Sequence, residues 1–244
     1  MPVDLYLAKS TDKAPYYSGY RDAVHGSIMQ QRNMDIIANN LANLNTPGYK
    51  ADRLIFNDVM TRQVKTYYDQ GSLRTTGNPL DVAISGEGFF QVRTPQGIRL
   101  TRDGSFHMKS DGTLVTSSGY PVLGGGGVIA LNPEGPKPFI DEKGNISQGS
   151  DTVGRLAVVK VGDKRQLEKV GKNLFAAPGG RAPATTPATD YEIHQGALEM
   201  ANVQVVREMV DMIAAFRGFE SYQKAIRAMN EIDMKAATQV GQVF

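Results

Sequence analysis

Near the amino end of the chain, apolar residues recur at intervals of three and four positions. This row begins after Tyr20, ends before Asn45 and consists of Val24, Ile28, Met34, Ile37, Leu41 and Leu44. Such spacing places side chains on one face of an α-helix, so we predict a helix over about 20–45. Thr46-Pro47-Gly48 should end it, because proline disfavours a helical conformation in the preceding residue and glycine readily adopts the left-handed cap.

A second and longer row occupies the carboxyl end, from about Leu198 to Val243, without a proline. Its members are Val203, Val206, Met209, Ile213, Phe216, Phe219, Tyr222, Ile226, Met229, Ile232, Ala236, Val240 and Val243. The spacing predicts a helix of about 40 residues, roughly 60 Å long at ~1.5 Å per residue. In a helix of ordinary length the row would belong to the protein's own core. At this length we expect part of it to pack against another molecule.

Between these ends, short apolar or β-branched runs alternate with turn residues. Of the 26 glycines, 20 fall between Gly71 and Gly180. The runs that we expect to form strands are 81–84, 89–93, 98–102, 114–116 and 155–161. Thr94-Pro95-Gln96-Gly97 has proline and glycine where a β-turn places them, and Asp103-Gly104 and Asp111-Gly112 suit tight hairpins. The pattern predicts an antiparallel sandwich or open barrel.

These changes of pattern define the expected architecture. The predicted fold class is α+β, in which long N- and C-terminal helices form a coiled-coil-like stalk and the central domain is mainly antiparallel β. The predicted segments are an N-terminal helical assembly segment (1–50), a connector (51–80), a β-rich domain (81–180), a Pro/Ala/Thr-rich hinge (181–196) and a C-terminal helical assembly segment (197–244).

Composition excludes several functional classes. The net charge of +2 and the interleaving of basic with acidic residues do not suit a nucleic-acid-binding surface. The chain has no cysteine, which excludes disulfides, thiolate metal ligands and a cysteine nucleophile. No apolar run approaches the roughly 20 residues that cross a bilayer, so we expect no membrane span. The first twenty residues mix charges with prolines, so we expect no cleaved signal peptide.

The candidate chemical motifs favour a non-enzymatic protein. His25, His107 and His194 lie in separate segments, so isolated histidines are favoured over a metal site. The glycine run 124–127 lacks the spacing of a phosphate-binding loop and is better interpreted as a flexible turn. No nucleophile elbow or positioned carboxylate pair is present. We therefore expect no catalytic residue, cofactor, metal or small-molecule substrate.

Four groups of motifs follow one another along the chain. The first is IANNLANLNTPGYK at 37–50, and the second is GNPLDVAISGEGFF at 77–90. The third comprises 100–106, 112–116 and 119–124, and the fourth is QGALEMANV at 195–203. In this order they resemble the flagellar rod and hook family over most of the chain.

The resemblance implies a structural subunit of the bacterial flagellar rod, a helical torque-transmitting tube. The compact middle and the run 154–177 are most similar to the proximal rod subunit. The alternatives are a distal rod or hook subunit and, outside the family, a β-rich adhesin with a helical stalk. The resemblance further implies a place in the periplasmic rod of the basal body. Its partners would be other copies of this chain, other rod subunits and the flagellar type III export apparatus.

Both terminal apolar rows supply the expected assembly interface. It consists of Ile28, Ile37, Asn40, Leu41, Asn43, Leu44, Val206, Met209, Ile213, Phe216, Phe219, Tyr222, Ile226, Met229 and Ile232. Asparagines favour helix ends and turns, which is one interpretation of Asn40 and Asn43. The other is that a buried amide fixes the register of packed helices. We further hypothesise that the terminal segments are partly disordered before assembly and fold on joining the rod.

Overall fold

The computed structural model describes residues 15–56, 62–171 and 173–240. The predicted interface falls within these ranges, whereas residues 1–14 and Val243 of the sequence analysis lie outside them. The chain divides into two compact units. The helical unit comprises residues 1–41 and 204–244, and the β-rich unit comprises residues 42–203.

Two α-helices are present among the described residues: α1 (Pro15–Ala42) and α2 (Val205–Val240). Pro15 stands at the first position of α1, where its missing N–H costs no helical hydrogen bond. Helix α1 ends at Ala42, before the predicted stop at Thr46-Pro47-Gly48, and Gly48 adopts a φ of +67° in the turn that follows. Helix α2 has 36 residues, which corresponds to about 54 Å at ~1.5 Å per residue.

The predicted fold class was wrong, because no coiled-coil-like stalk is evident. The described residues form two helices and a large β-rich region, and the apolar row of α2 does not stay on one face. Phe216, Phe219 and Tyr222 are three positions apart each time, and each such step turns about 60° around a helix. The row therefore crosses from an exposed face to the face that packs on α1, so no continuous apolar seam forms.

The β-rich unit consists of short strands with antiparallel pairing throughout its described part. The strands before residue 110 are β1 (Asp52–Phe56), β2 (Arg62–Thr66), β3 (Leu73–Thr75), β4 (Val82–Gly86), β5 (Phe89–Thr94), β6 (Gly97–Thr101) and β7 (Phe106–Met108). Those after it are β8 (Leu114–Thr116), β9 (Leu123–Gly124), β10 (Gly127–Val128), β11 (Phe139–Ile140), β12 (Asn145–Gln148), β13 (Asp151–Arg155), β14 (Val158–Val161), β15 (Glu168–Lys169), β16 (Leu174–Ala176), β17 (Thr185–Pro187), β18 (Tyr191–Gln195) and β19 (Ala197–Glu199). The largest sheet has the order β15-β16-β6-β5-β14-β17.

Turn chemistry predicts part of this pattern. Thr94 pairs with Gly97 at the turn between β5 and β6, as expected. Gly112 has a φ of +82° in the turn between β7 and β8. Gly104 has another role: a Cβ there would lie 1.6 Å from the carbonyl oxygen of Val82. Glycine at that position permits a close backbone approach.

The main hydrophobic core lies inside the β-rich unit. Its fully buried members include Ile84, Phe90 and Phe106, and the rings of the two phenylalanines meet edge to face with centroids 5.2 Å apart. The segment expected to be a hinge contains β17 and β18, which pair with β14 and β4. Residues 197–199, which we expected to begin the C-terminal helix, form β19 and pair with β3. Backbone pairing across the sheet thus overrides the local helical pattern there.

Candidate assembly interface

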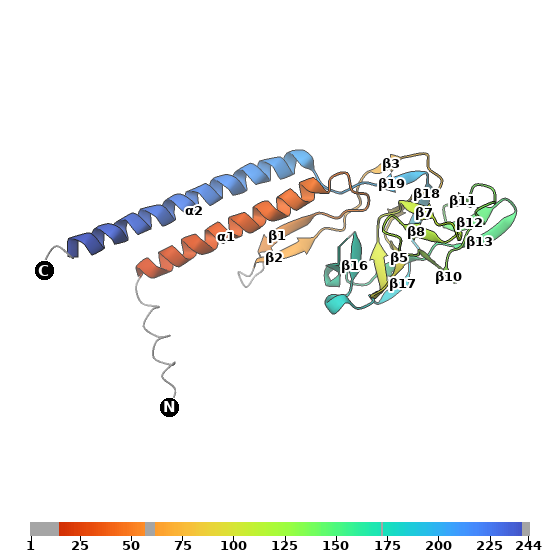
Figure 1. Cartoon of the computed structure of the whole chain (residues 1–244), viewed down its shortest axis with the longest axis horizontal. Helices are drawn as coiled ribbons and strands as arrows, with labels where there is room; N and C mark the ends of the chain where they lie inside the picture. The colour runs from red at the N-terminus through yellow and green to blue at the C-terminus, as the bar shows by residue number, and fades with distance from the viewer. Residues whose placement is uncertain (1–14, 57–61, 172, 241–244) are drawn as a thin grey trace, which may run out of the picture. The chain divides into compact units, whose positions relative to one another are not determined.

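Helices α1 and α2 lie side by side and run in opposite directions (Figure 1). Gly26 of α1 packs against the ring of Tyr222, whereas Asn40, further along α1, meets Glu208 near the beginning of α2. A Cβ on Gly26 would lie 2.4 Å from two ring carbons of Tyr222. Glycine therefore permits an approach that any other residue would obstruct.

Polar side chains also join the two helices. Asn40 Nδ2 donates to Glu208 Oε2 at 3.2 Å, and these residues are 0% and 3% exposed. Gln223 Nε2 donates to the hydroxyl of buried Ser27 at 3.0 Å. Glu208 lies in the first turn of α2, where the partial positive charge of the helix end favours a carboxylate. These bonds require one particular register of the two helices.

The predicted interface residues near the amino end occupy different environments. Ile28 is 51% exposed, whereas Ile37 is 4% exposed and Leu41 is partly buried. Asn43 and Leu44 lie beyond the end of α1. Asn43 accepts hydrogen bonds from the backbone N–H and hydroxyl of Thr46, so it contributes to a turn. Leu44 packs against a small cluster of buried residues: Tyr49, Ala51, Ala201 and Val203.

The predicted residues of α2 fall into two groups. Val206, Met209, Ile213, Phe216 and Ile232 are 53–77% exposed. Phe219, Tyr222, Ile226 and Met229 are partly buried. Val210, 60% exposed, was missed although it lies four positions after Val206 and three before Ile213. We call the exposed row in the first half of the helix, Val206, Met209, Val210, Ile213 and Phe216, the α2 apolar face.

A buried charge cluster ties the two ends of the β-rich unit to its body. Lys50 Nζ lies 2.5 Å from Glu199 Oε1, and Arg102 Nη1 lies 3.1 Å from Glu199 Oε2. The three residues are at most 4% exposed. The Gly71 N–H also donates to the Glu199 carboxylate, at 3.0 Å. We call Lys50, Arg102 and Glu199 the clasp.

Two cations share one carboxylate in the clasp, so backbone carbonyls complete their hydrogen bonding. Lys50 donates to Asp69 O at 2.8 Å, and Arg102 donates to Gly86 O at 2.6 Å. Burial lowers the pKa of Lys50 and of Arg102, and the negative charge of Glu199 opposes both shifts. Arg102 Nε is buried without a hydrogen-bond partner in the described part of the chain.

The sequence analysis missed the clasp because its members are far apart in the chain. Glu199 is 149 positions from Lys50 and 97 from Arg102. Each residue lies in one of the quoted motifs, at 37–50, 100–106 and 195–203. Glu199, a charged residue between Leu198 and Met200, was the available signal, because buried charges need partners.

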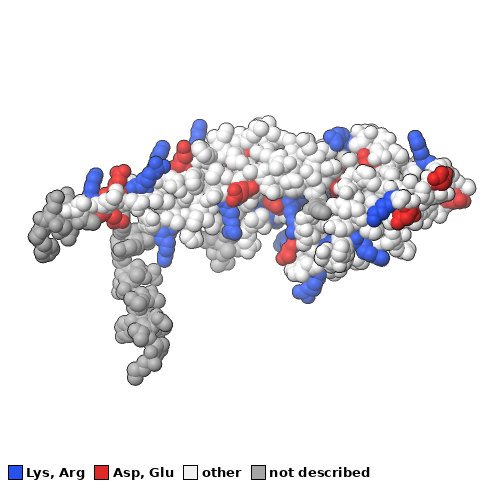
Figure 2. Space-filling view, in the orientation of Figure 1, with Lys and Arg blue, Asp and Glu red and all other residues white. Residues whose placement is uncertain are grey.

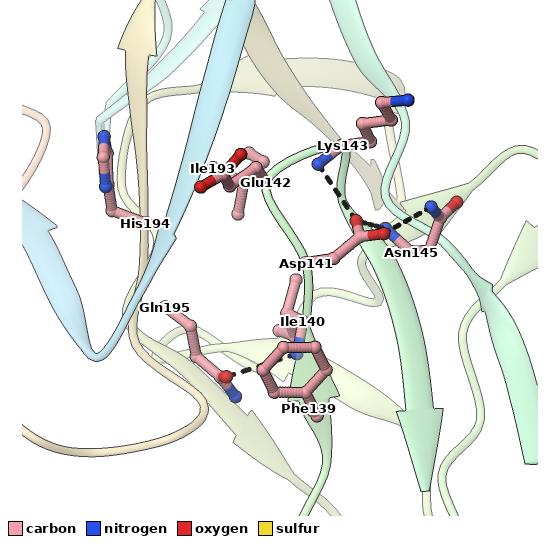
Figure 3. Close-up of a pocket in the computed structure, with 9 residues that line it drawn as sticks. All are labelled: Phe139, Ile140, Asp141, Glu142, Lys143, Asn145, Ile193, His194 and Gln195. Atoms are coloured by element: carbon pink, nitrogen blue, oxygen red, sulfur yellow. Dashed lines mark hydrogen bonds between the residues drawn. The ribbon is translucent and has the colours of Figure 1, made fainter. Parts of the chain in front are cut away.

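An open depression of about 700 Å³ lies beside the β11–β12 turn, and Figure 3 shows the residues that line it. Asp141 accepts hydrogen bonds from the backbone N–H groups of Lys143 and Asn145, at 2.9 and 2.8 Å, and from the Asn145 amide at 2.7 Å. These bonds lower the pKa of Asp141, the largest contribution coming from the Asn145 side chain. The carboxylate thus organises its own turn.

The described residues contain no cluster of three or more side chains suited to a metal, and no helix there is apolar and long enough to cross a membrane. On the face in Figure 2, basic and acidic residues are interspersed. His194, the histidine beside the depression, lies 4.0 Å from Glu192.

Three models of known protein families match successive parts of the chain. The Flagella basal body rod protein family model matches residues 22–50, the Flagellar hook protein FlgE/F/G D1 domain model 83–148, and the Flagellar basal body rod FlgEFG protein C-terminal model 194–239. Each clasp residue comes from a different one of these regions.

Three individual relatives each align with 86–88% of the chain. Flagellar basal-body rod protein FlgF of Caulobacter vibrioides is 36% identical over 231 residues, covering 87% of this chain and 94% of that protein. Flagellar basal-body rod protein FlgG of Buchnera aphidicola subsp. Schizaphis graminum is 35% identical over 249 residues, covering 86% and 95%. FlgG of Bacillus subtilis is 31% identical over 258 residues, covering 88% and 95%.

Proposed function

Because the chain belongs to the flagellar basal-body rod protein family, we propose that it polymerises through the α2 apolar face with copies of itself and with neighbouring rod subunits. Members of this family are structural proteins of the flagellar basal body, not enzymes, and they assemble with other rod components. The rod transmits torque, so its subunits need many distributed contacts rather than one reactive residue.

The exposure of the α2 apolar face is the observation that carries this proposal. Its five members are each more than half exposed, and their spacing of three and four positions places them next to one another along one side of the helix. Fully burying one large apolar side chain contributes roughly 1.5–3 kcal/mol before ordering costs. A surface of this kind is characteristic of a protein–protein contact. If it meets a different surface of the next subunit, the contact is heterologous and extends as a helix.

A paired substitution tests the proposal. Ile213→Ser with Phe216→Ser removes two members of the α2 apolar face. Arg207→Ser with Asp211→Ser is the control, because these residues form an exposed pair at 3.9 Å on another face of α2. We expect the first variant to keep its Tm but to be lost from purified basal bodies, and the control to be incorporated. Incorporation of the first variant at the wild-type level would refute the proposal.

We propose a place in the proximal rod. The alignments with FlgG run over 249 and 258 positions, more than the 244 residues of this chain, although they cover 86% and 88% of it. These alignments therefore contain insertions relative to this chain. The alignment with FlgF runs over 231 positions and covers 87% of the chain, so it contains fewer inserted positions than either alignment with FlgG. A map of the basal body that places this chain next to the hook would contradict the proximal assignment.

We propose that the flagellar type III apparatus exports the chain. The absence of cysteine supports passage in an unfolded state, because no disulfide has to be reduced first. In cells with an inactive export apparatus, the chain should accumulate in the cytoplasm. Delivery to the periplasm in those cells would count against this route.

A further inference from the structure

A basic and aromatic groove lies between β2 and the loop after β14. We define the groove by Lys65, Tyr67, Tyr68, Arg102, Lys164 and Arg165. Two adjoining hollows, of about 470 and 310 Å³, share Lys65, Tyr68, Lys164 and Arg165. All of these residues belong to the β-rich unit. The groove is therefore a feature of one compact body.

The charged side chains that line the groove favour the binding of a carboxylate. Four basic side chains line the larger hollow, against two acidic ones, Asp69 and Glu87. Glu87 is at the rim and pairs with Lys164 at 2.9 Å, and this contact holds the pKa of Glu87 below its usual range. Arg165 pairs with Asp163 at 2.9 Å, whereas Lys65 lies 5.6 Å from the centroid of the Tyr67 ring. Arg102 is already paired with Glu199 in the clasp, so Lys65 is the basic side chain of the groove that has no carboxylate partner in the described part of the chain.

Arg102 gives a second observation at the same hollow. Arg102 lines it and is 4% exposed, and its Nε is buried without a hydrogen-bond partner among the described residues. A buried N–H of a guanidinium is costly to leave unsatisfied. Because this Nε has almost no accessible surface, an entering carboxylate would satisfy it only through a water held beneath the wall of the hollow.

The β11–β12 turn has the complementary chemistry. Phe139 is 62% exposed and Glu142 is exposed, whereas the neighbouring Asp141 is engaged by its own turn (Figure 3). Glu142 is therefore the acidic side chain of the turn that remains for an outside partner. Phe139 supplies an aromatic ring that suits Tyr67 and Tyr68.

We propose that the groove of one copy receives the β11–β12 turn of a second copy, with Glu142 directed to the basic side chains and Phe139 to the tyrosines. The contact joins two different surfaces, so it extends from copy to copy. It rests on the proposed self-association of the chain but uses residues separate from the α2 apolar face.

Engineered cysteines test this contact without interference, because the chain has none of its own. Lys65→Cys protein is mixed with Glu142→Cys protein, so any bond between these two positions joins different molecules. Lys109→Cys, at an exposed site outside the groove, replaces Lys65→Cys in the control mixture. We expect oxidation to give at least several-fold more of the 65–142 linked dimer than of the control dimer. Equal yields would overturn the proposal.

Charge reversal provides an independent test in the full chain. Lys65→Glu and Glu142→Lys should each weaken self-association about tenfold at low salt, and the double variant should restore it. The same series in the Ile213→Ser, Phe216→Ser background isolates the groove from the α2 apolar face. Failure of the double variant to recover would refute the groove contact. Wild-type incorporation of the α2 variant would instead refute the proposed function.

Discussion

Lys50 and Glu199 form a buried ion pair across 149 positions of sequence, with Nζ and Oε1 2.5 Å apart. Lys50 follows α1 and Glu199 ends β19, before α2. The pair therefore holds together, within the β-rich unit, the two chain segments that lead to the helices. Arg102 adds a bond from the β body to the same carboxylate.

Replacing Glu199 by glutamine should strongly destabilise the β-rich unit. The substitution conserves shape but leaves Lys50 and Arg102 buried without their counter-charge, which typically costs about 3–5 kcal/mol. Urea unfolding of the purified chain measures the loss. Lys160→Met is the control, because Lys160 pairs with the largely exposed Asp190 and such pairs are worth about 0–1 kcal/mol. Equal losses for the two variants would show that the clasp carries no special stability.

Asn40→Leu should weaken the packing of α1 on α2. It removes the donor to Glu208, a carboxylate that is 3% exposed, and a hydrogen bond to a charged group is worth roughly 1.5–3 kcal/mol. Thermal unfolding of Asn40→Leu, Glu208→Leu and the double variant gives the coupling energy. Asn43→Leu is the comparison, since Asn43 bonds Thr46 in the turn after α1. Additive effects of Asn40→Leu and Glu208→Leu would contradict a direct role of their bond.

Local patterns predicted local elements. The three-and-four spacing predicted helices where α1 and α2 lie, and Pro95 with Gly97 predicted the β5–β6 turn. The sequence pattern predicted less well which residues of α2 are exposed and which pack on α1. Successive steps of three from Phe216 move the apolar row around the helix. Val210 was omitted although its neighbours on the same face were included.

Long-range pairing was beyond the sequence pattern. Ala197–Glu199 has no strand alternation that distinguishes it from the helix after it, and its pairing with β3 depends on distant residues. The clasp likewise unites three segments by the fold alone. The groove depends on side chains from separate segments, so Lys65 of β2 and Lys164, which follows β14, carry no common spacing.

Two glycines of α1 should respond in opposite directions to alanine. At Gly26 a Cβ would lie 2.4 Å from the Tyr222 ring, so Gly26→Ala should destabilise the helix pair by about 1–3 kcal/mol. At Gly19 the nearest atom, Met229 Cε, would be 3.6 Å away, an ordinary contact. Gly19→Ala should therefore stabilise by up to about 1 kcal/mol through helix propensity. Calorimetry measures the change in stability of each variant. Stabilisation by Gly26→Ala would show that the Tyr222 side chain of α2 moves aside without cost.

The raised pKa of Tyr68 should lower the free energy of unfolding at alkaline pH relative to neutral pH. Burial raises its pKa from 10.0 to about 12, and its ring packs edge-on to Phe89 and Phe175 with centroids 6.0 and 5.4 Å apart. Its hydroxyl donates to Leu167 O at 3.3 Å. Between the ordinary and the raised pKa, the unfolded chain has released this proton and the folded chain still holds it. The unfolded state then binds fewer protons, so the free energy of unfolding falls as pH rises through this window.

Comparison with Tyr68→Phe isolates this residue from the nine other tyrosines. The difference in tyrosinate absorbance between wild type and Tyr68→Phe should titrate near 12. The variant should also lose part of the alkaline slope of the unfolding free energy, because it has no proton to release at this position. A difference titration centred at the ordinary tyrosine value, with an unchanged slope, would mean that the solvated groove keeps the Tyr68 hydroxyl accessible to water. Binding of a second copy in the groove should then protect that hydroxyl and raise the pKa of Tyr68 in the assembled state.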